Sequence, residues 1–303
     1  IEKGLFWQRQ HVSTMWRSET KTIIRHISSP NQQLQDKYQY SQMHANRSNS
    51  ESVQAFSVPF TERDFHHMTN KSPSLQLLEA AKSGDYDSAI QALRNGANIN
   101  IQNRKDETPL ILASENGHHN LVDLFLRHEA NVSLRSIDDH TALMLAVDKG
   151  NELIVQMLLT YGADPDTRFC GKPVLIHAID LGLYTIAKQL LEKGANVNIT
   201  SIFSDYTPLV NACLQDFDEL ASLLLDYGAD PNKASSIGVT PLIMAVHKKA
   251  VKSVLILLER GAQVNHETVS KSTALLEAAR EGYLELVRIL LEAGADWTHR
   301  DVT

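Results

Sequence analysis

Leucine-rich segments recur along the last three quarters of the chain, with their apolar positions at helical spacing. They span residues 121–126, 154–159, 186–191, 220–225, 254–258 and 286–291, and each predicts an amphipathic helix. A Gly-Ala pair recurs with them, beginning at Gly96, Gly162, Gly194, Gly228, Gly261 and Gly294, while one expected pair reads Glu129-Ala130. The spacings of this site are 33, 33, 32, 34, 33 and 33 residues. A fixed period near 33 indicates a stacked helical array, which usually offers a long binding surface.

The start of a shorter helix recurs with the same period. Threonine suits the N-cap and proline the first helical position, and these starts stand at Thr108, Thr141, Thr207, Thr240 and Thr273. A small residue four positions into each short helix lets paired helices pack closely, and the alanines there are Ala113, Ala146, Ala178, Ala212, Ala245 and Ala278. The glycine of each pair suits the left-handed residue that closes a helix. Each unit is therefore a turn, a short helix, a second helix and an outward hairpin.

These recurring motifs resemble the ankyrin repeat, whose signature is a 33-residue unit with the sequence Thr-Pro-Leu-His-x-Ala. The resemblance covers about residues 73–303 and implies an all-α solenoid of about seven helix-turn-helix units with β-hairpin loops. The signature histidine is absent, and apolar residues replace it at Ile111, Met144, Ile176, Val210, Ile243 and Leu276, which implies a more apolar packing there. The fourth unit reads Pro173-Val174-Leu175 in place of the usual start, after a loop one residue short.

The domain boundaries follow from this periodicity. We expect the array to span 58–303, with an N-terminal cap at about 73–103. Its last unit stops without a polar closing unit, so we expect a truncated C-terminal end. Residues 1–57 carry no repeat: about 1–27 form a basic amphipathic segment, and a polar linker follows. This segment is either an intramolecular ligand of the array, a flexible extension, or sequence that is not native to the array.

Composition narrows the function classes. The sequence contains no run of 18 apolar residues, so it predicts no membrane-spanning helix. The two cysteines, Cys170 and Cys213, fit a reducing compartment. Residues 73–303 hold 20 Lys and Arg against 30 Asp and Glu, a net of −10. Such an acidic array is a poor nucleic-acid binder and favours a partner with some positive charge. We expect an intracellular protein in the cytoplasm, with the nucleus as an open alternative.

Two sets of residues are candidates for binding a protein or peptide. Apolar residues recur where the hairpin tips should face solvent, which commonly marks an interaction site: Ile137, Phe169, Ile202, Phe203, Ile237 and Val269, with Tyr206 close by. By the ankyrin resemblance, partners also meet the exposed face of the short helix. The candidates there are Leu112, Leu145, Asp148, His177, Asn211, Leu214, Met244, His247 and Glu277. The alternative for the tips is that neighbouring hairpins pack these side chains against each other.

Signatures of catalysis are lacking. No histidine pairs with cysteines or carboxylates at zinc-ligand spacing, and no phosphate loop or nucleophile elbow occurs. We expect no enzyme activity, no cofactor and no metal. The ankyrin resemblance adds one candidate modification, asparaginyl hydroxylation in the Gly-Ala-x-x-Asn word, which Asn100, Asn198, Asn232 and Asn265 match.

The function predicted is a scaffold or adaptor that binds a partner through its concave face and hairpin tips. The alternative is a regulatory or targeting region of a larger enzyme or channel, because ankyrin arrays accompany many functions. A third hypothesis is recognition of a modified lysine, for which Phe169, Phe203 and Tyr206 would have to converge on one pocket.

Overall fold

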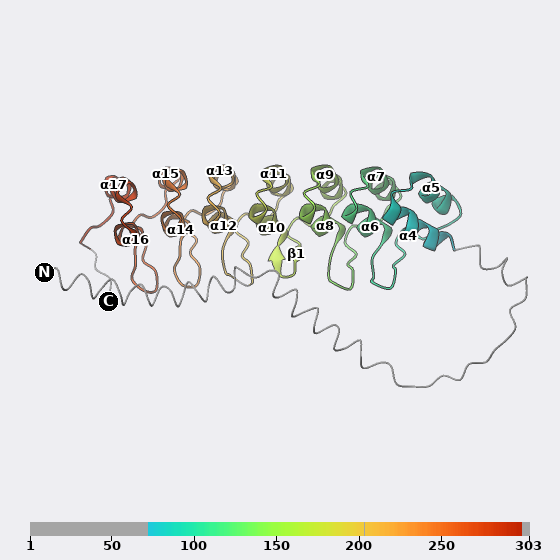
Figure 1. The fold of residues 1–303 in the computed structure, drawn as a ribbon, viewed down its shortest axis with the longest axis horizontal. Coiled ribbons are helices and arrows are strands. Elements are labelled where there is room, and N and C mark those ends of the chain that lie inside the picture. The colour runs from blue at the N-terminus through green and yellow to red at the C-terminus, as the bar shows by residue number, and fades with distance from the viewer. Residues whose placement is uncertain (1–71, 203, 299–303) are drawn as a thin grey trace, which may run out of the picture. The chain divides into compact units, whose positions relative to one another are not determined.

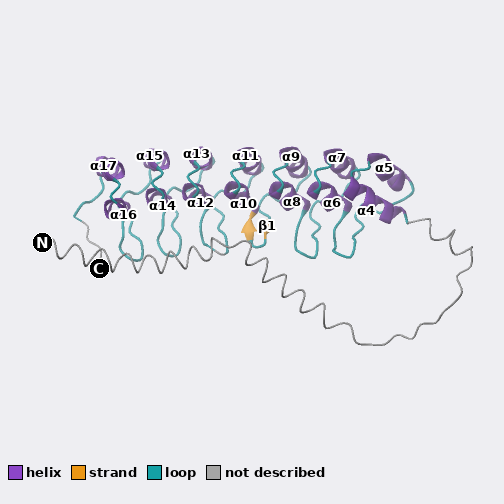
Figure 2. Ribbon diagram, viewed as in Figure 1, coloured by secondary structure: helices purple, strands orange, loops and turns teal. Residues whose placement is uncertain are grey.

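The computed structural model describes residues 72–202 and 204–298, and within these residues it is a row of seven helical pairs (Figure 1). The basic segment 1–27, the linker, Phe203 and the chain end after Thr298 lie outside the described residues. We number the pairs as units 1 to 7, and units 2 to 7 each include the hairpin loop that precedes their first helix. Figure 2 shows these loops on one side of the row, beside the first helices of units 2 to 7.

The helices alternate along the chain. The first helices of units 1 to 7 are α4 (Pro73–Ser83), α6 (Pro109–Glu115), α8 (Ala142–Asp148), α10 (Val174–Asp180), α12 (Pro208–Leu214), α14 (Pro241–His247) and α16 (Ala274–Glu281). The second helices are α5 (Tyr86–Arg94), α7 (His119–Arg127), α9 (Glu152–Thr160), α11 (Tyr184–Glu192), α13 (Asp218–Asp226), α15 (Val251–Glu259) and α17 (Leu284–Glu292). This confirms the predicted all-α solenoid.

Five of the first helices begin at a threonine cap. Each hydroxyl accepts a hydrogen bond from the backbone amide three residues later, at 3.2–3.3 Å, which satisfies an amide that the helix leaves unpaired. Unit 4 differs, because Pro173 supplies no side-chain cap. Its loop instead forms a short antiparallel ladder of β1 (Arg168–Phe169) and β2 (Lys172–Pro173), and the Val174 amide donates to the Thr167 carbonyl at 2.9 Å.

The second helices end in left-handed residues, as the Gly-Ala words predict. The six glycines of those words have φ between 81° and 87°, and Glu129 takes the same region with φ 62°. A non-glycine residue pays a steric penalty there. Unit 2 is therefore the one unit among those described whose second helix closes on a side chain that disfavours the turn.

The core is a continuous strip between neighbouring units. The six recurring alanines of the first helices are fully buried, which confirms the close packing of helix pairs. Five of the six residues that replace the signature histidine are also buried, and Leu276 is half-buried. The apolar packing expected at that position is therefore present in units 2 to 6.

Candidate interaction surface

Four aliphatic side chains lie exposed at the hairpin tips. The exposed fractions are 68% for Ile137, 69% for Ile202, 45% for Ile237 and 74% for Val269. The Val269 amide donates to the Ile237 carbonyl at 3.1 Å, so the tips of units 6 and 7 are direct neighbours. Their side chains are left to solvent, and the alternative in which the tips bury each other does not hold for these four residues.

Phe169, a predicted tip residue, and Tyr206, expected close to the tips, are less exposed than these four side chains. The Phe169 side chain is half-buried because its ring stacks between His140 and His177, with centroid distances of 4.8 and 5.0 Å. Tyr206 is 6% exposed, and burial raises the pKa of its phenol. The expected full exposure of Phe169 is therefore wrong, and a role of Phe169 or Tyr206 in partner binding stays a prediction. With Phe203 outside the described residues, a shared aromatic pocket has no support among the three candidates.

The candidates on the first helices are mostly covered. Five of these side chains are buried: Leu112, Leu145, Asn211, Met244 and Glu277. Their expected exposure has to be corrected, because the neighbouring first helices and hairpins pack over that position. Leu214, Asp148, His177 and His247 are half-buried and retain some accessible surface. A role for any of them in partner binding stays a prediction.

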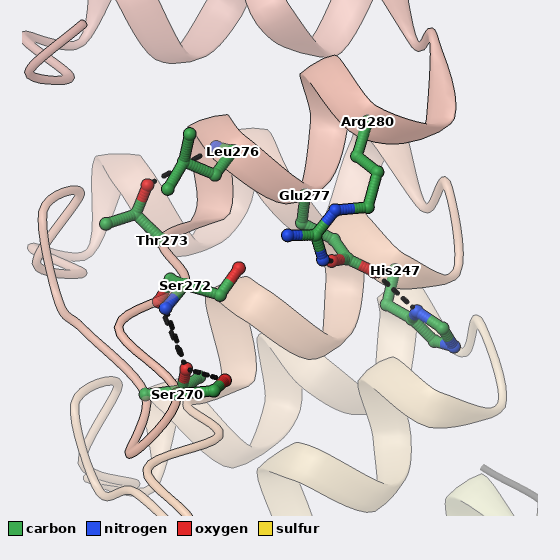
Figure 3. A network of polar contacts seen from close by, with 8 residues as sticks. His247, Ser270, Ser272, Thr273, Leu276, Glu277 and Arg280 are labelled. Atoms are coloured by element: carbon green, nitrogen blue, oxygen red, sulfur yellow. Dashed lines mark hydrogen bonds and ion pairs between the residues drawn. The ribbon is translucent and has the colours of Figure 1, made fainter. Parts of the chain in front are cut away.

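Charged side chains on this face are already paired. Nε2 of His177 lies 3.1 Å from Oδ1 of Asp148, and Nζ of Lys172 lies 2.6 Å from Oδ2 of Asp180. Figure 3 shows Glu277 of α16 between His247 of α14 and Arg280. The carboxylates of Asp148, Asp180 and Glu277 are therefore already paired within the array and do not form an unpaired acidic row for a basic partner.

The same view shows the hairpin that leads into α16. The hydroxyl of Thr268 accepts a hydrogen bond from the Ser272 amide at 3.0 Å and contacts the Ser270 hydroxyl at 3.0 Å; Ser270 and Ser272 are labelled in Figure 3. Thr273 caps α16 through the Leu276 amide at 3.3 Å. These hydrogen bonds fix the conformation of the hairpin that carries the exposed Val269.

The four candidate hydroxylation sites form part of a bonding series between units. The Oδ1 atoms of Asn100, Asn198, Asn232 and Asn265 each accept a hydrogen bond, at 2.7–2.9 Å, from the amide of the second residue after the glycine position of the next Gly-Ala word. We call this contact a ladder bond. It gives these asparagines a structural role, and their hydroxylation stays a prediction.

Reactive chemistry is sparse in the described residues. Cys170 is exposed and Cys213 is buried, and both are free thiols. Within 72–202 and 204–298, no group of three or more His, Cys, Asp and Glu is placed to hold a metal ion. No helix in the same ranges is both long and apolar enough to cross a membrane.

Sequence reasoning missed His140, Arg135 and Thr167, which join units 3 and 4. Nη2 of Arg135 donates to the Thr167 hydroxyl at 3.2 Å, and His140 stacks on Phe169. The shortened loop before Val174 was the available signal, because it marks the one hairpin that has to close differently.

Comparison with solved structures supports the fold. The ankyrin repeat domain of Bcl-3, described as a unique member of the IkappaB protein family, superposes with a TM-score of 0.64 at 24% identity, over 70% of this chain and 97% of that one. The human ASB11 ankyrin repeat domain gives 0.59 at 24% identity, over 73% and 98%. At this identity the likeness shows the fold alone.

Sequence relatives match over short stretches. The human 2-5A-dependent ribonuclease is 39% identical over 79 residues, which are 26% of this chain and 11% of that protein. A putative ankyrin repeat-containing protein of Treponema pallidum is 40% identical over 79 residues, 26% of each. This chain thus spans a small part of either relative.

The family model for ankyrin repeats covers most of the array. It matches three times, at residues 77–169, 175–268 and 234–301, and these matches cover the helices from α5 to α17 except for Val174, the first residue of α10. The model, the period and the fold agree, and the chain belongs to the ankyrin-repeat family.

Proposed function

We propose that this chain is a non-catalytic protein-interaction module, a scaffold or adaptor that binds a protein or peptide partner through its hairpin tips. Ankyrin repeats are generally protein–protein interaction modules. The observation that carries the proposal here is the exposure of Ile202, Ile237 and Val269 in three consecutive units. Exposed apolar residues in a row commonly mark an interaction site.

The tips suit a partner with apolar anchors. Burying one aliphatic side chain contributes about 1.5–3 kcal/mol, so several tips together can offset the cost of association. The net charge of −10 over 73–303 favours a partner that also carries positive charge, through long-range attraction rather than through a defined acidic pocket. Leu214 and His247 are the first-helix residues with surface left to contribute.

The test is a pair of matched variants. Ile237→Asp with Val269→Asp should abolish capture of the partner, because it places charge where apolar contact is needed. Leu255→Asp is the control, since this residue of α15 is 43% exposed but lies on a second helix. Loss of capture in both variants, or in neither, would contradict binding through the tips.

The basic segment 1–27 is the candidate intramolecular ligand of this surface. Its charge is opposite to that of the array. Deleting 1–57 should raise the affinity for an external partner peptide if the segment competes for the tips. An unchanged affinity would remove the segment from the proposal and leave the tip surface intact.

The second candidate function is a regulatory or targeting region of a larger enzyme. The match to 2-5A-dependent ribonucleases, which extends over 11% of the human protein, favours it. Under this reading the tips bind either the rest of that enzyme or its substrate. Sequencing the complete transcript would separate the two candidates, since a catalytic domain in the same chain supports the second.

A further inference from the structure

Ladder bonds join most neighbouring units at the base of their hairpins. Beyond the four asparagines, Asp166 accepts from the Asn196 amide at 2.8 Å and Ser74 accepts from the Asn98 amide at 3.1 Å. At the junction of units 3 and 4 the acceptor position is occupied by Ser133 and the donor is the Asp164 amide. In the described part of the chain, no hydrogen bond joins the Ser133 side chain to the Asp164 amide. The ladder bond is therefore missing between units 3 and 4.

A different set of contacts crosses the same junction. The Phe169 ring of unit 4 stacks on His140 of unit 3 at 4.8 Å with an interplanar angle of 11°. Its other face stacks on His177 at 5.0 Å and 15°. Nε2 of His177 in turn lies 3.1 Å from Oδ1 of Asp148 in unit 3. We call His140, Asp148, Phe169 and His177 the clasp.

The clasp depends on the unusual hairpin of unit 4. With no threonine cap and one residue fewer, this loop forms β1 and β2, and Lys172 pairs with Asp180 of α10 at 2.6 Å. The loop is thereby folded toward the first helix, which brings Phe169 over His177. Ile137 and Ile202 in the flanking units remain 68% and 69% exposed, so the inward turn is specific to this unit.

We propose that the array can bend at the junction of units 3 and 4, which acts as a hinge. The contacts of the clasp hold this junction in the closed conformation. A backbone-to-side-chain ladder bond resists opening wherever it is present. At this junction the apolar core between the units remains, but the ladder bond is replaced by side-chain stacking, one His–Asp contact and the Arg135–Thr167 hydrogen bond. These side-chain contacts can separate without unfolding a helix. Opening would displace Ile137 relative to Ile202, Ile237 and Val269 and so change the surface that a partner meets.

The hinge does not depend on the tips being a binding site, and its test uses the chain alone. Spin labels at Asn120→Cys in α7 and Glu259→Cys in α15 report the distance across the junction by pulsed dipolar spectroscopy. Both positions are exposed. The full chain would carry Cys170→Ser, because Cys170 is also exposed, whereas Cys213 is buried. A second pair, Lys193→Cys and Glu259→Cys, lies entirely on one side of the hinge.

Phe169→Ala should broaden the distance distribution of the pair that crosses the junction and leave the second pair unchanged. Adding Ser133→Asn to that variant should narrow the distribution again, because asparagine supplies the missing acceptor. An unchanged distribution in Phe169→Ala, or an equal broadening of both pairs, would overturn the proposal. Ile237→Ala is the matched control at a tip outside the junction and should change neither pair.

Discussion

Oε1 of Glu277 lies 2.9 Å from Nδ1 of His247, although the Glu277 side chain is only 3% exposed (Figure 3). The carboxylate has a second neighbour in Arg280, with 3.6 Å between Oε2 and Nη1. A buried carboxylate is costly unless it is paired and hydrogen-bonded. The pair therefore joins units 6 and 7 at a position where most units place an uncharged side chain.

Removing the histidine should destabilise the C-terminal units. His247→Ala leaves the buried carboxylate with the more distant Arg280, and a hydrogen bond to a charged group contributes about 1.5–3 kcal/mol. Because His247 is 35% exposed, we expect a loss of about 1 kcal/mol in the free energy of unfolding. Urea denaturation measures it, with the exposed neighbour Lys248→Ala as control. Equal stability of the two variants would contradict the argument.

Ser253 occupies a core position that is apolar in units 2 to 5 and 7. It is fully buried and its hydroxyl has no hydrogen-bond partner in the described residues, whereas Leu220 and Leu286 hold the same position one unit away on either side. Leaving a buried hydroxyl unpaired costs about 1–3 kcal/mol. Ser253→Ala should therefore raise the unfolding free energy by about 1 kcal/mol, measured by urea denaturation.

A matched serine separates this effect from helix propensity. Ser222 lies in α13, is half-buried, and gains the same backbone preference on replacement by alanine. Ser222→Ala should raise the unfolding free energy only through the higher helix propensity of alanine, by about 0.5 kcal/mol or less. A gain at Ser253 no larger than the gain at Ser222 would show that the buried hydroxyl is not a liability.

The fold could be predicted from the sequence because most units repeat the same local sequence features. The threonine caps, the left-handed glycines and the buried alanines are local features, and the structure confirms each of them in several units. Their period also fixes which helices are neighbours, since a solenoid unit packs mainly on the units before and after it.

The candidate surface was harder to predict, because exposure depends on what the neighbouring unit covers. Ile237 and Tyr206 both lie in hairpin loops, yet the first is 45% exposed and the second 6%. Phe169 was expected at a tip and stacks between His140 and His177 instead. The exposure of each of these side chains depends on contacts between units, and the period of the sequence does not predict those contacts.

The ladder bonds give a prediction about conservative replacement. Asn198 accepts the Asp230 amide at 2.9 Å, and Asp166 makes the same contact in unit 4 with a carboxylate. Asn198→Ala should lower the unfolding free energy by about 1 kcal/mol through loss of the acceptor. Asn198→Asp should retain most of that stability. Thermal unfolding compares the two, and equal losses would show that the acceptor oxygen is not what matters.

The two thiols should differ sharply in reactivity. Burial raises the pKa of the Cys213 thiol to about 12, so almost none of it is thiolate at pH 8, and the thiolate is the reactive form. Cys170 is exposed. Alkylation of the native chain followed by mass spectrometry should modify Cys170 alone, and both thiols should react in denaturant. Rapid modification of native Cys213 would indicate that the core of unit 5 opens readily.

Glu129 holds the turn that a glycine closes in the other described units. Its φ of 62° lies in the left-handed region, which costs a residue with a side chain about 1–2 kcal/mol. Glu129→Gly relieves that cost but makes the unfolded chain more flexible, so the expected net gain in unfolding free energy is about 0.5–1 kcal/mol. Gly162→Ala in the next unit is the reciprocal change: its added Cβ meets no atom within 4 Å, so a loss there reports backbone strain rather than a clash. Urea denaturation should show a higher free energy of unfolding for Glu129→Gly and a lower one for Gly162→Ala. A destabilised Glu129→Gly would mean that the glutamate side chain stabilises the turn by more than its backbone conformation costs.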